Sequence, residues 1–292
     1  MRIAGIIDDA VNGARMSVIA PLVPHFGVEA HHAVLSEPEM FRELLVRHGL
    51  VLVRRVVFDD TELAAFGRQV GNGRLELSAR SRSHSRTEPA VSNLTNLLSP
   101  DGEPIGYGND ATDYWHSDQE FRVEPATIGL LYCFLPPESG GQTTFASTDV
   151  DHLGIDRGTI SQLEKAQSRR RPAPAYDHDL APQVLVSHSA LLTHHGSQRR
   201  TLYISELAFD LNIAGEMLSP EVLSGLLAAV TAQPNTYCHN WKQGDLLVFD
   251  NTQLIHRREA FSGSRWLKSV KIFASQHIFT VPCGTIVEHL QC

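Results

Sequence analysis

The sequence predicts a mainly β chain with inserted helices, an α+β protein built on a double-stranded β-helix core of the jelly-roll, cupin-like kind. Short apolar runs recur after residue 115 and are separated by turn signals such as Pro136-Pro137 and Ser139-Gly140-Gly141. Helical periodicity is concentrated near the start of the chain and between residues 150 and 235. Many short strands with helical segments between them are typical of a jelly-roll barrel with helical insertions.

The chain opens with a helix, a strand and a second helix. The first helix is expected over 37–48, where apolar residues recur at helical spacing, and Gly49 ends it. Residues 50–53 are all apolar and predict a short buried strand. Thr61 is expected to cap the second helix, which runs to Gln69.

Polar loops with short strands are expected over 74–112, a stretch rich in Ser, Asn, Asp and Gly. Later strands are expected at 127–134, 143–146, 202–204, 246–249 and 267–274. Another helix is expected over 219–232, because Ser219 can cap it and Pro220 suits its first turn. No linker composition marks a boundary, so residues 1–292 are expected to form a single domain.

The composition argues against several classes of protein. Hydrophobic residues make up 42% and charged residues 20%, which is ordinary for a globular protein. The formal net charge of −8 argues against a nucleic-acid partner, and the basic run Arg169-Arg170-Arg171 is interpreted as a solvated loop. No apolar stretch is long enough to span a membrane. The four cysteines form no metal or redox motif, which favours a cytoplasmic location.

One short segment carries the chemistry. His116 and Asp118 are two residues apart, so in a strand they present an imidazole and a carboxylate on the same face. His256 follows a predicted turn and buried strand, and it could complete a three-ligand metal site. Two histidines and one carboxylate leave coordination positions open, which suits Fe(II) and O₂. The alternative is a strand-end His that is hydrogen-bonded to Asp, because the chain has 15 histidines and chance pairs are easy.

Four segments with an ordered pattern extend this interpretation. They are WHSDQEF (115–121), LPPESGGQTTF (135–145), WKQGDLLVFDNTQLIHRRE (241–259) and SRWLK (264–268). In this order they resemble the taurine dioxygenase family of Fe(II)/2-oxoglutarate enzymes. The resemblance implies an oxidoreductase that uses Fe(II), O₂ and 2-oxoglutarate as cosubstrate.

The resemblance also implies roles for individual residues. His116, Asp118 and His256 match the iron ligands. Thr143 and Arg265 match the residues that bind the far carboxylate of 2-oxoglutarate, and a planar guanidinium can hold a carboxylate by two hydrogen bonds. The alternatives are that Thr143 is a plain turn residue and that Arg265 is a surface charge.

The substrate is expected to be a small molecule. Many relatives carry a second Arg where this chain has Ser269, and sulfonate users bind the substrate anion with it, so a taurine-like substrate is not expected. Strand alternation places Lys271, but not Lys268, on the face of Ser269. Acidic residues before the iron motif favour an amine or an amino acid. The candidate substrate contacts are Asn93, Tyr107, Asp110, Thr112 and Ser269.

The expected reaction is hydroxylation of an unactivated C–H bond in an amino-acid-like or natural-product intermediate. Desaturation or cyclisation by the same chemistry, a Zn²⁺ hydrolase or lyase, and an inactive jelly-roll metal-binding protein stay open, as does a homo-oligomer. Asp118 argues against halogenation, which related enzymes perform with Gly or Ala at this position. His188, His194 and His195 form a second histidine group, for which a structural hairpin is favoured.

Overall fold

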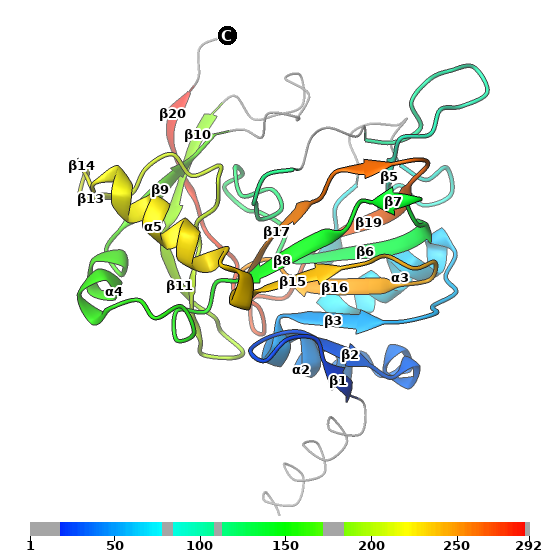
Figure 1. The fold of residues 1–292 in the computed structure, drawn as a ribbon, viewed down its shortest axis with the longest axis horizontal. Helices are drawn as coiled ribbons and strands as arrows, with labels where there is room; N and C mark the ends of the chain where they lie inside the picture. Colours follow the sequence, from blue (N-terminus) through cyan, green and yellow to red (C-terminus); the bar gives the residue numbers. More distant parts are fainter. Residues whose placement is uncertain (1–17, 78–83, 108–112, 172–183, 290–292) are drawn as a thin grey trace, which may run out of the picture.

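The structure, a computed structural model, describes residues 18–77, 84–107, 113–171 and 184–289 (Figure 1). Its largest sheet has the strand order β1-β2-β3-β16-β6-β19-β4, and β5 pairs with β19 beside β4. Only the β2–β3 pair is parallel among these described strands. The strands are β1 (Val18–Pro21), β2 (Val28–Ala30), β3 (Leu50–Val53), β4 (Arg74–Leu75), β5 (Ser92–Thr95), β6 (Ile128–Leu135), β16 (Leu246–Asp250) and β19 (Trp266–Phe273).

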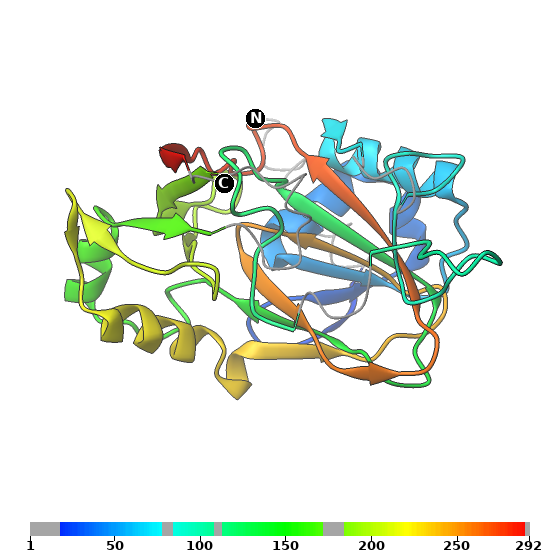
Figure 2. The ribbon, with the colours of Figure 1, turned by 90° about the horizontal axis from the view of Figure 1, so that it is seen from above.

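A three-stranded sheet packs against this large sheet (Figures 1 and 2). It consists of β15 (Thr236–His239), β8 (Thr143–Ser147) and β17 (Leu254–Arg258), in the order β15-β8-β17. Apolar side chains from both sheets fill the space between them, including Leu131, Phe145, Leu247 and Leu267. Two largely antiparallel sheets with a shared core are in keeping with the double-stranded β-helix core that the sequence predicts.

Two helices, α2 (Pro38–His48) and α3 (Asp60–Gly71), cover the outer face of the large sheet. Gly49 ends α2 in the left-handed conformation (φ 72°), as its position predicts. The expectation that Thr61 caps α3 is wrong, because Asp59 is the N-cap. The Asp59 carboxylate accepts from the Glu62 amide and the Glu62 carboxylate accepts from the Asp59 amide, which forms a capping box.

A second β region lies at the other end of the molecule (Figures 1 and 2). Its sheet has the order β14-β13-β9-β10-β20 and packs with two helices around a separate apolar cluster. Ser219 is the N-cap of α5, as predicted, but its hydroxyl bonds Glu221 and not a helix amide. These elements are β9 (Gln167–Arg170), β10 (Val184–Ser189), β13 (Asn212–Ile213), β14 (Glu216–Met217), β20 (Thr285–His289), α4 (Arg157–Leu163) and α5 (Pro220–Val230).

Short elements complete the described chain. A hairpin of β11 (Leu191–Thr193) and β12 (Arg200–Leu202) joins the second β region, and β7 (Ser139–Gly140) pairs with β18 (Phe261–Ser262). Two 3₁₀ helices span His32–Ser36 and Gln233–Asn235. Among the described residues, no helix has the length and apolar character that a membrane span requires.

The basic run is not the solvated loop that the sequence suggested. Arg170 ends β9 with no exposed surface, and its Nε donates to Glu120 Oε2 at 2.6 Å. Arg169 pairs with Asp210 on the other side of the strand. The expectation failed because a buried Arg is stable when a carboxylate distant in sequence neutralises it, and the local composition contains no sign of that partner.

Candidate metal centre

The backbone brings the two predicted histidines together. His116 forms an isolated antiparallel bridge with His256, in which each amide donates to the other's carbonyl at 2.9–3.0 Å. The segment around residue 116 therefore extends the three-stranded sheet past β17. Directly paired residues of an antiparallel ladder point to the same side of the sheet. The two imidazole rings accordingly lie 4.3 Å apart between their centroids.

Asp118 completes a group of three side chains. Its Oδ1 lies 3.9 Å from the Nε2 atoms of both His116 and His256. One ligand atom from each residue falls within 4.8 Å of the others, and this is the one such group of three His, Cys, Asp or Glu side chains in the described parts of the chain. All three residues are buried. The structure thus brings together the three residues that the sequence singled out.

Hydrogen bonds fix the direction of the ligand atoms. His116 Nδ1 lies 3.0 Å from the carbonyl oxygen of Tyr114, and a carbonyl can only accept, so Nδ1 carries the proton. The lone pair on Nε2 is then free and faces Asp118. An imidazole held by a carbonyl at one nitrogen and open at the other is the usual state of a metal ligand.

The turn that carries Asp118 is clamped from two sides. Asn251, just after β16, accepts from the Asp118 amide at 2.7 Å and donates to the Asp118 carbonyl at 2.8 Å. Glu120 accepts from the Ser117 amide and from Arg170, so β9 of the second β region also holds the turn. The sequence analysis did not identify these supports, although Asn251 lies within the pattern that ends at His256.

The charges of the triad suit a divalent cation. Burial raises the pKa of Asp118, but the Lys271 ammonium and the two imidazoles outweigh burial and lower this pKa to about 2. Burial and the neighbouring His116 hold the pKa of His256 well below its usual value. At neutral pH the site therefore offers a carboxylate and a neutral His256, the forms that bind metal.

Arg265 is a buried cation. It is 6% exposed, and its Nε has no hydrogen-bond partner in the described residues. Its backbone is held by Thr95 and Asn96, which bond its carbonyl and its amide. Burial and the nearby Arg258 lower its pKa to about 10, so it stays cationic at neutral pH. A buried cation of this kind fits the carboxylate of a cosubstrate such as 2-oxoglutarate.

Thr143 begins β8 and is buried. Its Oγ1 accepts a 3.1 Å hydrogen bond from Trp241 Nε1, so the hydroxyl proton is left to donate to another group. Arg258 pairs with Thr143 in the β17–β8 register, and both Arg258 and Arg265 lie over the Phe261 ring. Arg258 was not predicted from the sequence, although it lies two residues after His256 on one strand and therefore on the same face.

The candidate substrate residues that the structure describes do not all face the triad. Ser269 is buried, and its hydroxyl has no hydrogen-bond partner among the described residues. Asn93 accepts from Trp266 Nε1 at 3.0 Å and pairs in register with Lys268, so its side chain does not turn toward the triad. The Tyr107 amide donates to the Asn93 carbonyl. Asp110 and Thr112 lie outside the described residues.

The two lysines of β19 separate as strand alternation predicts. Lys268 pairs with Asp60 of α3 on the outer face of the large sheet. Lys271 pairs with Asp118 inside. Lys271 is therefore the lysine that belongs to the site.

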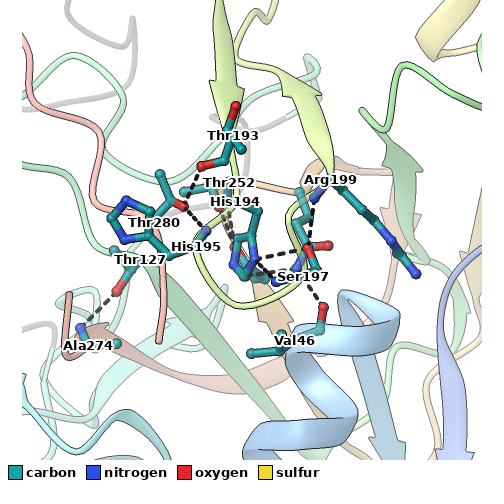
Figure 3. Close-up of polar contacts among 12 residues, drawn as sticks. Val46, Thr127, Thr193, His194, His195, Ser197, Arg199, Thr252, Ala274 and Thr280 are labelled. Carbon is teal, nitrogen blue, oxygen red and sulfur yellow. Dashed lines mark hydrogen bonds and ion pairs between the residues drawn. The ribbon is translucent and has the colours of Figure 1, made fainter. Parts of the chain in front are cut away.

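Two members of the second histidine group, His194 and His195, make structural contacts (Figure 3). In the turn after β11, the Ser197 amide donates to His194 Nδ1 at 3.0 Å, so Nε2 carries the proton and faces Asp250 Oδ2 at 2.8 Å. The Asp250 carboxylate also accepts from Thr252 and Gln253. These contacts attach the hairpin to the turn that precedes β17, and so support the strand of His256.

Comparison with known proteins identifies the class. The family described as "Taurine catabolism dioxygenase TauD, TfdA family" matches residues 19–270. The chain belongs to this family, and with it to the alpha-ketoglutarate-dependent (2-oxoglutarate-dependent) dioxygenases, a class of oxidoreductase.

Particular relatives support this membership. The alpha-ketoglutarate-dependent 2,4-dichlorophenoxyacetate dioxygenase of Cupriavidus pinatubonensis is 26% identical over 268 residues, which cover 83% of this chain and 92% of the relative. Pentalenolactone F synthase of Streptomyces avermitilis is 26% identical over 194 residues, which cover 58% of this chain and only 62% of the relative.

A solved structure supports the architecture. The crystal structure of a taurine dioxygenase from Burkholderia xenovorans matches with a TM-score of 0.74 at 20% identity, covering 93% of this chain and 95% of that one. At this identity the likeness shows the fold alone, and it confirms the predicted mainly β architecture with a double-stranded β-helix core.

Proposed function

We propose that this protein is an Fe(II)-dependent dioxygenase that uses 2-oxoglutarate and O₂ to hydroxylate an unactivated C–H bond of a small metabolite, with release of succinate and CO₂. The observation that carries the proposal is the convergence of two imidazole Nε2 atoms and one carboxylate oxygen in a buried place. This donor set suits Fe(II) and leaves other coordination positions open. Family membership supports the same reaction class.

Each residue has a defined part in this proposal. His116, Asp118 and His256 would hold Fe(II), while Arg265 and Thr143 would bind the far carboxylate of 2-oxoglutarate. Bound Fe(II), with O₂ and 2-oxoglutarate, supplies the oxidising power that C–H cleavage requires. The protein positions the substrate and excludes water, and the rings of Phe145 and Phe249 do so beside His256, at 5.6 and 4.8 Å between ring centroids.

The proposed substrate is an amino-acid-like or natural-product intermediate and not a small sulfonate. Ser269 is neutral, and a hydroxyl cannot bind an anion as a guanidinium does. Two relatives are named for the carboxylates 2,4-dichlorophenoxyacetate and phenoxypropionate and another for sulfate esters, so the substrate panel should include carboxylates. Lys271 is an interior cation that such a group could approach.

The reaction class is tested by 2-oxoglutarate turnover. We expect succinate formation with Fe(II), no 2-oxoglutarate turnover with Zn²⁺, and loss of activity in His116→Ala, Asp118→Ala and His256→Ala. His195→Ala is the matched control, because this histidine lies on the exposed hairpin turn. Turnover by metal-free protein would contradict the proposal, and substrate conversion with bound Zn²⁺ but without consumption of O₂ or 2-oxoglutarate would indicate a hydrolase or lyase.

The substrate is tested by a panel of taurine, amines, amino acids and aryloxy acids, with succinate release as the first readout. Mass spectrometry then separates the outcomes, because hydroxylation adds one oxygen atom whereas desaturation or cyclisation removes two hydrogens. The Asp110→Asn variant should release succinate more slowly than the parent with any amine that is a substrate. Efficient use of taurine would contradict the exclusion of sulfonates, and an unimpaired Asp110→Asn variant would remove the argument for amines.

A further inference from the structure

The two oxygens of Asp118 have different neighbours. Oδ1 faces the two histidines, at 3.9 Å from each Nε2. Oδ2 accepts a hydrogen bond from the Lys271 ammonium, which also forms an ion pair with it. A metal ion seated among the three side chains would meet Oδ1, while Oδ2 is already bound by an internal cation.

The fold fixes Lys271 in this place. Val270 and Ile272 belong to the cluster under α2 and α3, so alternation turns Lys271 into the space between the sheets. Its partner on β6 in the register is Gly129, which has no side chain. A Cβ at position 129 would lie 2.1 Å from the Phe249 ring, so the glycine lets that ring occupy the space beside Lys271.

A carboxylate can bind a metal through one oxygen or through both. In a site with two histidines and one carboxylate, the second oxygen would take a coordination position that 2-oxoglutarate or O₂ needs. A hydrogen bond from an ammonium to that second oxygen competes with the metal for it. The Lys271 side chain is 22% exposed and that of Asp118 10%, so bulk water only partly weakens the contact.

We propose that Lys271 is a positioning residue that holds Asp118 as a one-oxygen ligand and so keeps one further coordination position open on the metal. The inference rests on the proposed function, since it requires a metal in the triad. It also has a cost, because a cation beside the site repels a divalent metal. The protein gives up metal affinity and gains an open position for its cosubstrate.

The test uses metal-free full-length protein to which Mn²⁺ is added in place of Fe(II), so that binding can be measured without O₂-dependent turnover. Calorimetric titration gives the Mn²⁺ affinity, and water-proton relaxation gives the number of waters on the bound ion. In Lys271→Met we expect Mn²⁺ to bind roughly tenfold tighter, because a repelling charge is lost and Oδ2 is freed. We also expect about one water fewer on the ion and 2-oxoglutarate to bind about tenfold more weakly.

Two variants serve as controls. Lys271→Arg keeps the charge and the donor, and should resemble the parent. Lys268→Met removes a lysine of the same strand on the outer face, and should leave all three readouts unchanged. Mn²⁺ affinity and water count equal to the parent in Lys271→Met, or weaker Mn²⁺ binding, would overturn the role of Lys271. If the parent binds Mn²⁺ but not 2-oxoglutarate, the proposed function fails. The number of waters on the bound Mn²⁺ in the parent and in Lys271→Met then still tests the positioning role of Lys271.

Discussion

At the scale of single residues, Arg265 is a buried cation whose Nε has no hydrogen-bond partner among the described residues. A buried cation without a carboxylate partner costs several kcal/mol, and Arg258 nearby adds repulsion. Such an arrangement persists when a bound anion offsets the cost. The far carboxylate of 2-oxoglutarate has the charge and the planar geometry to do this.

Arg265→Ala should therefore weaken 2-oxoglutarate binding by about 2–4 kcal/mol, or roughly 30- to 1000-fold, because a buried charge-assisted pair is lost. Without ligand, the same variant should melt no lower than the parent, since the variant removes a buried charge whose Nε has no partner among the described residues. Titration of the Mn²⁺-loaded protein gives the first value and a thermal melt the second. If Arg265→Ala bound 2-oxoglutarate as tightly as the parent and Lys271→Ala bound it much more weakly, Lys271 and not Arg265 would be the residue that binds the far carboxylate.

At the scale of elements, the turn that carries Asp118 is fixed by a strand outside the two core sheets. Glu120 bonds the Ser117 amide and the guanidinium of Arg170, and both charged groups are almost fully inaccessible to water. Breaking a buried ion pair leaves an uncompensated charge, which is more costly than losing the pair itself.

Arg170→Met should lower the free energy of unfolding by about 3–5 kcal/mol and weaken metal binding, because the Glu120 carboxylate is left buried and unpaired. Arg169→Met on the same strand is the control. Its pair with Asp210 is one-third exposed on the Arg side, and the Asp210 carboxylate keeps the Arg169 backbone amide as a donor, so we expect a smaller loss than in Arg170→Met. Urea unfolding measures the free energy of unfolding of both variants. Equal losses in the two would show that the buried Arg170–Glu120 pair contributes no more to stability than the Arg169–Asp210 pair.

Local patterns in the sequence predicted several elements but not their distant partners, and the strand expected at 202–204 lies instead at Arg200–Leu202. Gly49 and the apolar run at 50–53 placed the end of α2 and the strand β3 correctly, because these signals act within one turn or one strand. The cap of α3 was misplaced by two residues, since both Asp59 and Thr61 can accept from an amide and only the fold selects one. Nothing local links Arg170 to Glu120.

The candidate site divides in the same way. The triad was predictable because two ligands share one short motif and the third follows a strongly patterned strand. Asn251, Arg258 and Lys271 gain their importance only from cross-strand register and from the packing of the turn. Register between distant strands depends on the whole sheet, and a single sequence does not reveal it.

At the scale of the whole molecule, burial of neutral histidines couples stability to pH. Burial, with Arg170 nearby, lowers the pKa of His188 to about 3. Its Nε2 donates to the Arg122 carbonyl at 2.9 Å. The folded pKa lies below the unfolded value of about 6.5, so the unfolded chain takes up the proton first as pH falls. The stabilisation is complete above pH 6.5 and is lost progressively below it.

At pH 5 His188 should cost the folded state about 2 kcal/mol relative to pH 7.5. His188→Gln keeps an amide donor for Arg122 and does not titrate, so its free energy of unfolding should fall less between these pH values by about that amount. Urea unfolding of metal-free protein at both pH values measures it. A pH dependence in His188→Gln identical to that of the parent would contradict the assignment.

The backbone bridge between His116 and His256 has a consequence for the site without its metal. Each of these two amide protons is bonded to the other residue's carbonyl, so neither can exchange with solvent unless this pair of strands separates. Slow exchange of both amides in metal-free protein would mean that His116 and His256 are already positioned before metal binds and that metal binding requires no folding step. The exchange rates of these two amides would then report whether the site is intact, with or without bound metal or substrate.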